Sequence, residues 1–179
     1  MVKTTCIGAY PKPDYVDLPD WFNHPDGPDA MDPTERWSDA MNTLGNDAQS
    51  IISRGVQEFI ADQVEAGIDI PTDGEVPREN YIHYHCRYIE GIDFGVLTEV
   101  SLRNGAYSAR LPTVNGPVSA RNIFLVRDWK RAQACTDRPV KITIPGPMTI
   151  TDTTADAYYD DAERLGAKLA DALDRKSVV

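Results

Sequence analysis

The chain has 179 residues, with 28 acidic and 18 basic side chains, a formal net charge of −10 and a pI of about 4.7. This length suits one domain or part of a larger one. The acidic charge argues against nonspecific binding to nucleic acid or anionic membranes, because the mean field repels phosphate. No apolar run reaches the ~20 residues of a membrane span, and three widely spaced cysteines suit a reducing cytoplasm.

The N-terminal part is expected to contain two short strands separated by a long loop and a helix. Residues 4–8 are typical of a buried strand that ends in glycine. Residues 9–47 are rich in Pro, Asp, Asn and Gly, which predicts a long functional or partner-facing loop. Residues 48–66 have apolar positions at helical spacing and stop at Gly67, and residues 68–72 predict the second strand.

The remaining elements continue the alternation of helices and strands. They are predicted as a helix over 77–90, strands within 92–114, a helix over 118–134, a strand over 139–144 and a helix over 155–173. Asn104–Gly105 is a hairpin-type turn signal between the strands of 92–114. The order predicts an α/β fold with a mostly parallel sheet, in a single domain over 1–179 with no second domain.

In parallel α/β folds, ligands bind beyond the carboxyl ends of the strands. Polar or glycine-rich turns that should converge on one pocket occur at 7–10, 72–75, 107–110 and 145–149. Asp73 and Glu75 flank a glycine, and they could hold an ammonium or act as acid and base. Arg78 could clamp a carboxylate. A solvated acidic turn and a surface arginine remain open as alternatives.

The sequence His83-Tyr84-His85-Cys86 contains residue types that bind zinc. In a helix, His83 and His85 would point about 200° apart, and no other Cys or His lies at ligand spacing. The pattern therefore favours a structural role. Nucleotide-phosphate loops and a GxSxG elbow are not found, and Cys6 is expected to be an inert buried thiol.

Five blocks of sequence resemble, in the same order, the catalytic domain of cobalamin-independent methionine synthase. They are residues 4–11, 67–80, 90–91, 110–118 and 139–150. The first block is similar to the family's TTxIGSFP opening, and the second contains its GExxR pattern at Gly74, Glu75 and Arg78. The resemblance extends over almost the whole chain but over only the first half of that domain.

The resemblance implies a TIM barrel, the (β/α)8 fold, of which this chain supplies roughly the first half. It also implies a zinc-dependent methyl transfer from a folate-type donor to a thiol such as homocysteine, giving methionine. The family's substrate-binding positions correspond to Ile7, Gly8, Ala9, Asp73, Glu75, Arg78 and Arg110. Arg110 would lie near the folate, and Ile7, Gly8, Ala9 and Glu75 near the polar end of the amino acid. Asp73 and Arg78 belong to the same motif as Glu75.

The sequence also departs from the family pattern. Ala9 replaces a serine, Asn80 an aspartate and Thr153 a tryptophan near the pterin, so the chain could use another thiol (of the coenzyme-M type) or another methyl donor. The family's zinc ligands lie in the second half of the barrel, so we expect this chain to bind no zinc and to be inactive alone. The last residues, 175–179, suggest a truncation or frameshift.

A further alternative is a non-catalytic binding or assembly module. An open half barrel exposes two sheet edges, and self-association through them is the expected consequence.

Overall fold

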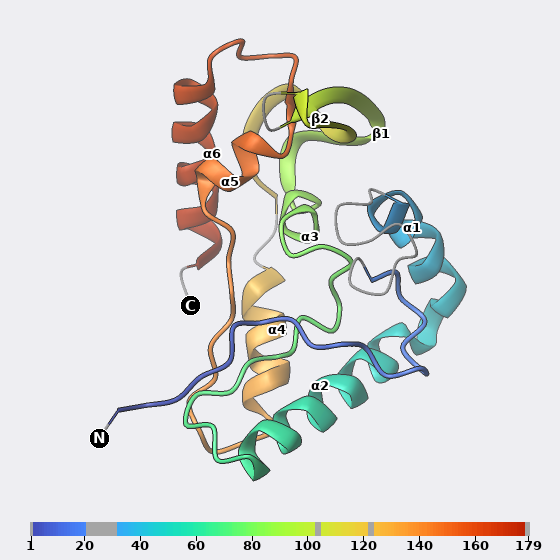
Figure 1. The fold of residues 1–179 in the computed structure, drawn as a ribbon, viewed down its shortest axis with the longest axis vertical. Helices are drawn as coiled ribbons and strands as arrows, with labels where there is room; N and C mark the ends of the chain where they lie inside the picture. The colour runs from blue at the N-terminus through green and yellow to red at the C-terminus, as the bar shows by residue number, and fades with distance from the viewer. Residues whose placement is uncertain (1, 21–31, 103–104, 122–123, 178–179) are drawn as a thin grey trace.

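The computed structural model describes residues 2–20, 32–102, 105–121 and 124–177 (Figure 1). Its elements are α1 (Asp32–Leu44), η1 (Gly45–Asp47), α2 (Ala48–Glu65), α3 (His83–Cys86), β1 (Ile89–Leu102), β2 (Tyr107–Ala120), α4 (Phe124–Gln133), α5 (Pro147–Asp152), β3 (Ala155–Asp156) and α6 (Ala162–Ser177). Within the described residues, none of these helices combines the length and the apolar character that crossing a membrane requires.

The continuous sheet is built on a long antiparallel hairpin of β1 and β2. β3 adds a short parallel pairing to β2, at Thr113–Ala155 and Val114–Asp156. The strands predicted within 92–114 are confirmed as a hairpin, although Asn104 of the predicted turn lies outside the described residues. The prediction of a mostly parallel sheet is wrong for this sheet, because the antiparallel hairpin accounts for most of its pairing.

Parallel pairing is found between three segments that the sequence predicts as strands. These are residues 4–8, 68–72 and 139–144, here called the parallel segments. They are joined by single bridges, Thr5 to Ile70 and Thr72 to Lys141. The predicted parallel direction is confirmed, whereas the predicted extent is too long. The side-chain amide of Gln63 on α2 hydrogen-bonds both the N–H and the C=O of Thr72, at 2.9 and 3.0 Å, and so holds the second segment in place of a longer strand ladder.

The helix predicted over 48–66 is confirmed as α2, whereas two other helix predictions are partly wrong. The helix predicted over 77–90 is reduced to α3, because a tight turn precedes it and Ile89 already belongs to β1. The predicted loop over 9–47 contains helix α1. Within that loop, Trp21 and Phe22 lie outside the described residues.

The last two predicted helices begin later than expected. α4 starts at Phe124 rather than at 118, because residues 118–120 still belong to β2 and Ser119 pairs with Glu90. α6 starts at Ala162 rather than at 155, because Ala155–Asp156 pair with β2. Helix α5 was not predicted at all. It follows Gly146 and has proline in its first turn, a position that suits the fixed φ of proline.

Two main clusters of buried apolar side chains flank the parallel segments. One joins α2, α4 and the N-terminal segment through Val16, Leu18, Ile52, Val56, Phe59, Ile60, Val76, Ala132 and Val140. The other joins α3, the hairpin, α5 and α6 through Ile82, Cys86, Ile89, Val114, Val118, Ile150, Tyr159, Leu165, Leu169, Ala172 and Leu173. In Figure 1 the N-terminal segment crosses α4 in the view shown.

Gly74 has no room for a side chain, and replacing it tests the turn that follows the second parallel segment. Its φ is +65°, and an added Cβ would lie 2.5 Å from Cδ2 of Phe59. We expect Gly74→Ala to lower the free energy of unfolding by about 2–4 kcal/mol, through clash and backbone strain together. Gly67→Ala is the matched control, because its φ is +84° with nothing within 4 Å, and it should cost about 1 kcal/mol. If urea unfolding shows that both variants lose the same free energy of unfolding, the close packing of Phe59 against Gly74 is contradicted.

Candidate functional site

The carboxyl ends of the three parallel segments meet at Gly8, Glu75 and Thr143. A Cβ on Gly8 would collide with Oε1 of Glu75 and would lie 3.2 Å from Cγ2 of Thr143. The Tyr10 N–H donates to the Gly74 carbonyl at 3.0 Å, and the Thr72 hydroxyl donates to the Gly8 carbonyl at 3.1 Å. Gly8 is therefore needed because the Glu75 carboxylate closes directly over its Cα.

A tight turn directs the Glu75 side chain inward. Gly74 and Glu75 both have left-handed φ, +65° and +56°, and Glu75 is one of only two described non-glycine residues with positive φ. The Glu75 N–H donates to Oδ1 of Asp73 at 3.2 Å, and the Arg78 N–H donates to the Glu75 carbonyl at 2.9 Å. Asp73 is 1% exposed and Glu75 8% exposed, so the alternative of a solvated acidic turn is wrong.

Arg78 binds the carboxylates of this turn from inside the protein. Its Nη1 donates to the carbonyl and to the hydroxyl of Thr143, both at 3.0 Å, and lies 3.4 Å from Oε1 of Glu75. Its Nη2 lies 3.5 Å from Oδ2 of Asp73. The residue is 3% exposed, so the alternative of a surface arginine is wrong too. Burial raises the pKa of Asp73, and the Arg78 charge offsets part of that rise.

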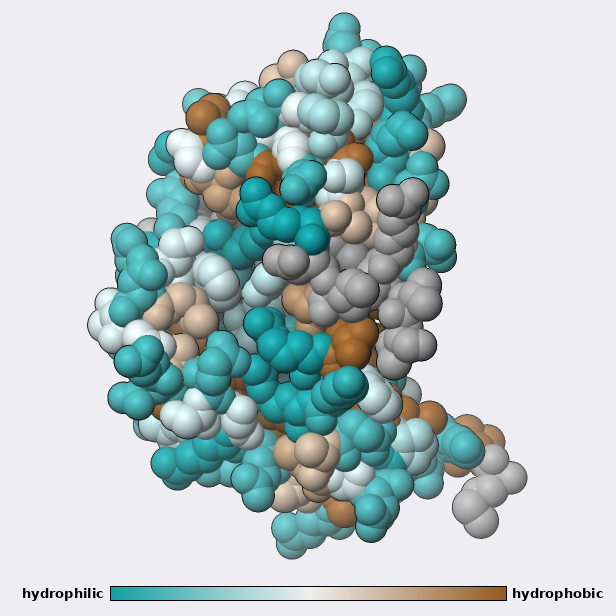
Figure 2. All heavy atoms as spheres, turned by 180° about the vertical axis from the view of Figure 1, so that it is seen from behind, coloured by the Kyte–Doolittle hydropathy of each residue, from teal (hydrophilic) through white to brown (hydrophobic). Residues whose placement is uncertain are grey.

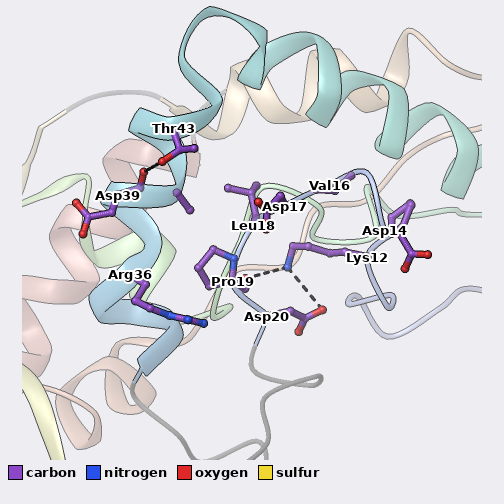
Figure 3. Close-up of a pocket in the computed structure, with 12 residues that line it drawn as sticks. Lys12, Asp14, Val16, Asp17, Leu18, Pro19, Asp20, Arg36, Asp39 and Thr43 are labelled. Atoms are coloured by element: carbon purple, nitrogen blue, oxygen red, sulfur yellow. Dashed lines mark hydrogen bonds and ion pairs between the residues drawn. The ribbon is translucent and has the colours of Figure 1, made fainter.

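Lys12 attaches the N-terminal loop to the same turn. Its Nζ donates to the Arg78 carbonyl at 2.8 Å. The same Nζ donates to the Pro19 carbonyl at 3.4 Å and lies 3.7 Å from Oδ2 of Asp20 (Figure 3). Burial lowers the pKa of Lys12, although Asp20, Glu79 and Glu75 oppose that shift. The contacts hold residues 12–20 beside the Glu75 turn.

Two hollows adjoin Lys12. The smaller, about 10 Å³, is lined by Ala9, Tyr10, Lys12, Asp20, Gly74, Glu75, Arg78, Glu79, Asn80 and Tyr81, and it has room for about one water molecule. The larger, about 490 Å³, lies between the 12–20 loop and α1 (Figure 3). The predicted residues Ala9, Glu75 and Arg78 line the smaller hollow, and none of the predicted residues lines the larger.

Arg110 is not brought to this cluster. It lies exposed on β2, and its Nη1 is 3.1 Å from Oε1 of Glu35 on α1. Of the four turns expected to converge, the 107–110 segment instead starts the second strand of the hairpin. Ile7 precedes Gly8 and is 93% exposed, so its side chain is not part of the buried cluster. Cys6, expected to be buried, is half-buried with Sγ 3.8 Å from the Tyr10 hydroxyl.

The His83 and His85 side chains serve structural roles, as the spacing favoured. The Thr153 carbonyl can only accept, so Nε2–H of His83 donates to it at 3.1 Å, which leaves Nδ1 to accept from the Thr34 hydroxyl at 3.0 Å. His85 Nδ1 lies 2.7 Å from the Tyr81 carbonyl. In the part of the chain that the structure describes, no three His, Cys, Asp or Glu side chains are grouped to hold a metal ion. These residues do not fit the zinc site that the resemblance implies for the whole enzyme.

Residues 24–176 match the family model for the catalytic domain of the cobalamin-independent synthase. The chain belongs to this family. It is 30% identical over 178 residues to a methionine synthase of Saccharolobus solfataricus, and 27% identical over 177 residues to one of Sulfolobus acidocaldarius. These matches include 98% of this chain but 48% and 47% of the relatives. The chain therefore spans about half the length of the curated relatives it matches.

Solved structures give the same result. A B12-independent methionine synthase from Shewanella sp. W3-18-1, in complex with selenomethionine, is 30% identical and superposes with a TM-score of 0.80. That match includes 97% of this chain and 46% of the Shewanella chain. The structure of a putative vitamin-B12-independent methionine synthase from Listeria monocytogenes, 20% identical with a TM-score of 0.59, supports the fold alone.

The motif of the cobalamin-independent synthase predicts Gly8, Glu75 and Arg78 as site residues. It does not predict Thr143 or Lys12. Thr143 lies near the carboxyl end of a predicted strand, which is where the rule for parallel folds places ligand-binding groups. That signal could have identified it. Lys12 follows a proline in a loop without helical or strand periodicity. No feature of the sequence predicts that this lysine is buried.

The protonation of His83 gives a test of this packing. Burial lowers the pKa of His83 to about 4, from an ordinary value of 6.5. As the pH falls, His83 binds a proton in the unfolded chain before it does so in the folded chain. The free energy of unfolding therefore decreases progressively between pH 6.5 and pH 4, by roughly 3 kcal/mol in total. We expect His83→Gln to lose less stability over that pH interval than the parent chain, in urea titrations at each pH. Parallel pH profiles would contradict the buried, neutral His83.

Proposed function

We propose that this chain forms the amino-acid-binding part of a methionine-synthase-like methyltransferase. The whole enzyme would transfer a methyl group from a folate-type donor to a thiol such as homocysteine. The observation that carries the proposal is the buried Glu75 carboxylate, which closes over Gly8 where three parallel segments end. The methionine synthases among its relatives, and the selenomethionine in the Shewanella structure, support this choice of ligand.

The proposed roles follow from the chemistry of each group. The Glu75 carboxylate accepts hydrogen bonds from the ligand ammonium, and the backbone at Ile7, Gly8 and Ala9 receives the rest of its polar end. Asp73 and Arg78 hold Glu75 in place. Since Ala9 has no hydroxyl, this loop offers backbone groups alone to a ligand carboxylate, and a different thiol acceptor remains the second candidate. Arg110 remains a proposed folate contact that would first have to leave Glu35.

In the proposed reaction the thiolate sulfur attacks the methyl carbon of the donor. The S–CH3 bond forms as the N–CH3 bond breaks, and the electron pair stays on the donor nitrogen, which then takes a proton. The described residues provide binding and orientation for the amino acid. We assign activation of the thiol to the second half of the barrel, where the resemblance places the zinc ligands.

We also propose that the three parallel segments are the first strands of a (β/α)8 barrel, and that residues 1–179 are one partial domain of it. The parallel order of the segments supports this. Apolar side chains lie exposed along their ends and just beyond: Val2 (91%), Ile7 (93%), Ile144 (42%) and Met148 (61%). Figure 2 shows hydrophobic side chains on the surface of the N-terminal segment. A non-catalytic half barrel that associates through these edges is the alternative that this exposure favours.

Removing the carboxylate charge of Glu75 tests the proposed binding role. We expect Glu75→Gln to weaken binding of L-methionine to the purified chain by about tenfold or more, because an ammonium–carboxylate hydrogen bond is replaced by a neutral one. Glu65→Gln is the control, since Glu65 is an exposed carboxylate at the end of α2. Isothermal titration calorimetry gives both affinities. Equal affinity in the two variants, or no binding by the parent chain, would contradict the proposal.

The metal content of the purified chain tests the assignment of zinc to the second half. We expect substoichiometric zinc after dialysis, and no methyl transfer from a folate donor to homocysteine by the chain alone. Elemental analysis by mass spectrometry measures the first, and chromatographic detection of methionine the second. Tightly bound zinc at one ion per chain would contradict the assignment of the zinc site to the second half of the barrel.

A further inference from the structure

Thr143 occupies a position in the site that neither the motif nor its family resemblance assigns. It lies on the third parallel segment, and its hydroxyl is placed between Arg78 and Glu75, two charged residues that follow the second. Nη1 of Arg78 donates to this hydroxyl at 3.0 Å and to the Thr143 carbonyl at 3.0 Å. The hydroxyl in turn contacts Oε1 of Glu75.

The direction of these hydrogen bonds follows from the groups themselves. A guanidinium only donates and an ionised carboxylate only accepts, whereas a hydroxyl has one proton to donate and lone pairs to accept with. Arg78 therefore donates to Thr143, and Thr143 donates to Glu75. Each bond has a charged partner, and in such a chain each bond polarises the next. The rotation of the Thr143 hydroxyl is fixed by its neighbours.

The two oxygens of the Glu75 carboxylate then have different surroundings. Oε1 receives the Thr143 hydroxyl and lies 3.4 Å from Nη1 of Arg78. Oε2 receives no hydrogen bond from the described residues. Because Glu75 is 8% exposed, the carboxylate has little freedom to exchange these roles. One oxygen is held by the protein, and the other is left as an acceptor.

We infer that Thr143 is a positioning residue for amino-acid recognition. Its hydroxyl holds one oxygen of the Glu75 carboxylate against Arg78, so that the other oxygen accepts a hydrogen bond from the ligand ammonium. The identity of the ligand rests on the proposed function, whereas the placement of the carboxylate rests on the contacts of this chain. The third parallel segment thus determines the geometry of a carboxylate in the turn that follows the second.

A purely structural hydroxyl would behave differently. It would join the second and third segments, and its loss would lower stability and weaken every ligand of the site to a similar degree. A positioning hydroxyl affects the ligand group that Glu75 contacts. Its loss should therefore reduce discrimination between a ligand with an ammonium and an otherwise similar ligand without one.

The experiment compares L-methionine with 4-(methylthio)butanoate, which lacks the ammonium, by calorimetry on the full chain. We expect Thr143→Val to weaken L-methionine binding about tenfold or more and to leave the butanoate nearly unchanged. Thr143→Ser retains the hydroxyl and should restore the affinity ratio to within about threefold of the parent. Thr143→Ala serves as the hydroxyl-free variant if the valine variant does not fold.

Thr154→Val is the matched control. Thr143 is half-buried and Thr154 is buried, at 6% exposed, but the Thr154 hydroxyl donates to the Ile150 carbonyl of α5. Removing it should lower stability without changing the ratio of the two affinities. Equal weakening of both ligands by Thr143→Val, or no rescue by serine, would overturn the inference.

A ligand-free measurement separates this inference from the proposed function. The ¹³C signal of the Glu75 carboxylate reports its hydrogen bonds whether or not any amino acid binds. It should move in Thr143→Val and return in Thr143→Ser. If the parent chain binds neither ligand, the proposed function fails, and a signal that shifts with the hydroxyl still supports the positioning role. An unmoved signal overturns it.

Discussion

The guanidinium of Arg78 lies among the ends of the parallel segments, and the local structure around the candidate site depends on its contacts. It reaches Thr143 on the third segment and the two carboxylates, Asp73 and Glu75, that end the second. Removing one member of a buried, charged network of this kind typically costs about 3–5 kcal/mol, because the remaining charges stay buried without a partner. Such a cost exceeds that of most single surface contacts. The network therefore holds together segments whose backbone pairing is limited to single bridges.

The short bridges between the parallel segments explain why side chains carry this role. A long parallel ladder would fix the strand ends through backbone hydrogen bonds. Here the Gln63 amide substitutes for part of the ladder at Thr72, and Lys12 fastens the following loop to the Arg78 carbonyl. Gly8 and Gly74 supply the close approaches that these contacts require. The exposed side chains of Ile7 and Met148 lie outside this network.

Periodicity and turn chemistry predicted the elements whose structure is determined locally. Helix α2 has a regular apolar spacing that ends at a glycine, and the hairpin has a turn signal between alternating strands, so both were predicted. The regions near 77–90 and 155–162 were assigned to helices because their local composition permits helix. Pairing with β2 overrides that preference at Ala155, and the left-handed turn at Glu75 overrides it before α3. No local pattern encodes pairings of that kind.

In the candidate site too, the sequence predicts the residues of a local motif and not those placed by contacts distant in sequence. Gly8, Glu75 and Arg78 belong to a recognisable motif, so their convergence could be expected from the parallel order of the segments. The burial of Lys12 and the hydrogen bonds of Thr143 depend on contacts 66 and 65 residues distant in sequence, and spacing alone does not reveal them. Arg110 shows the opposite case, since the hairpin carries it to Glu35 although the motif places it near a substrate.

We propose above that the Glu75 turn and the Gly8 loop bind the polar end of an amino acid. The most direct test is a titration of the ¹⁵N-labelled chain with L-methionine, followed residue by residue by NMR. We expect saturable shifts centred on the backbone amides of Gly8, Ala9, Gly74 and Glu75. Shifts confined to the larger hollow around Arg36 and Asp39, or no saturable shifts, would contradict it.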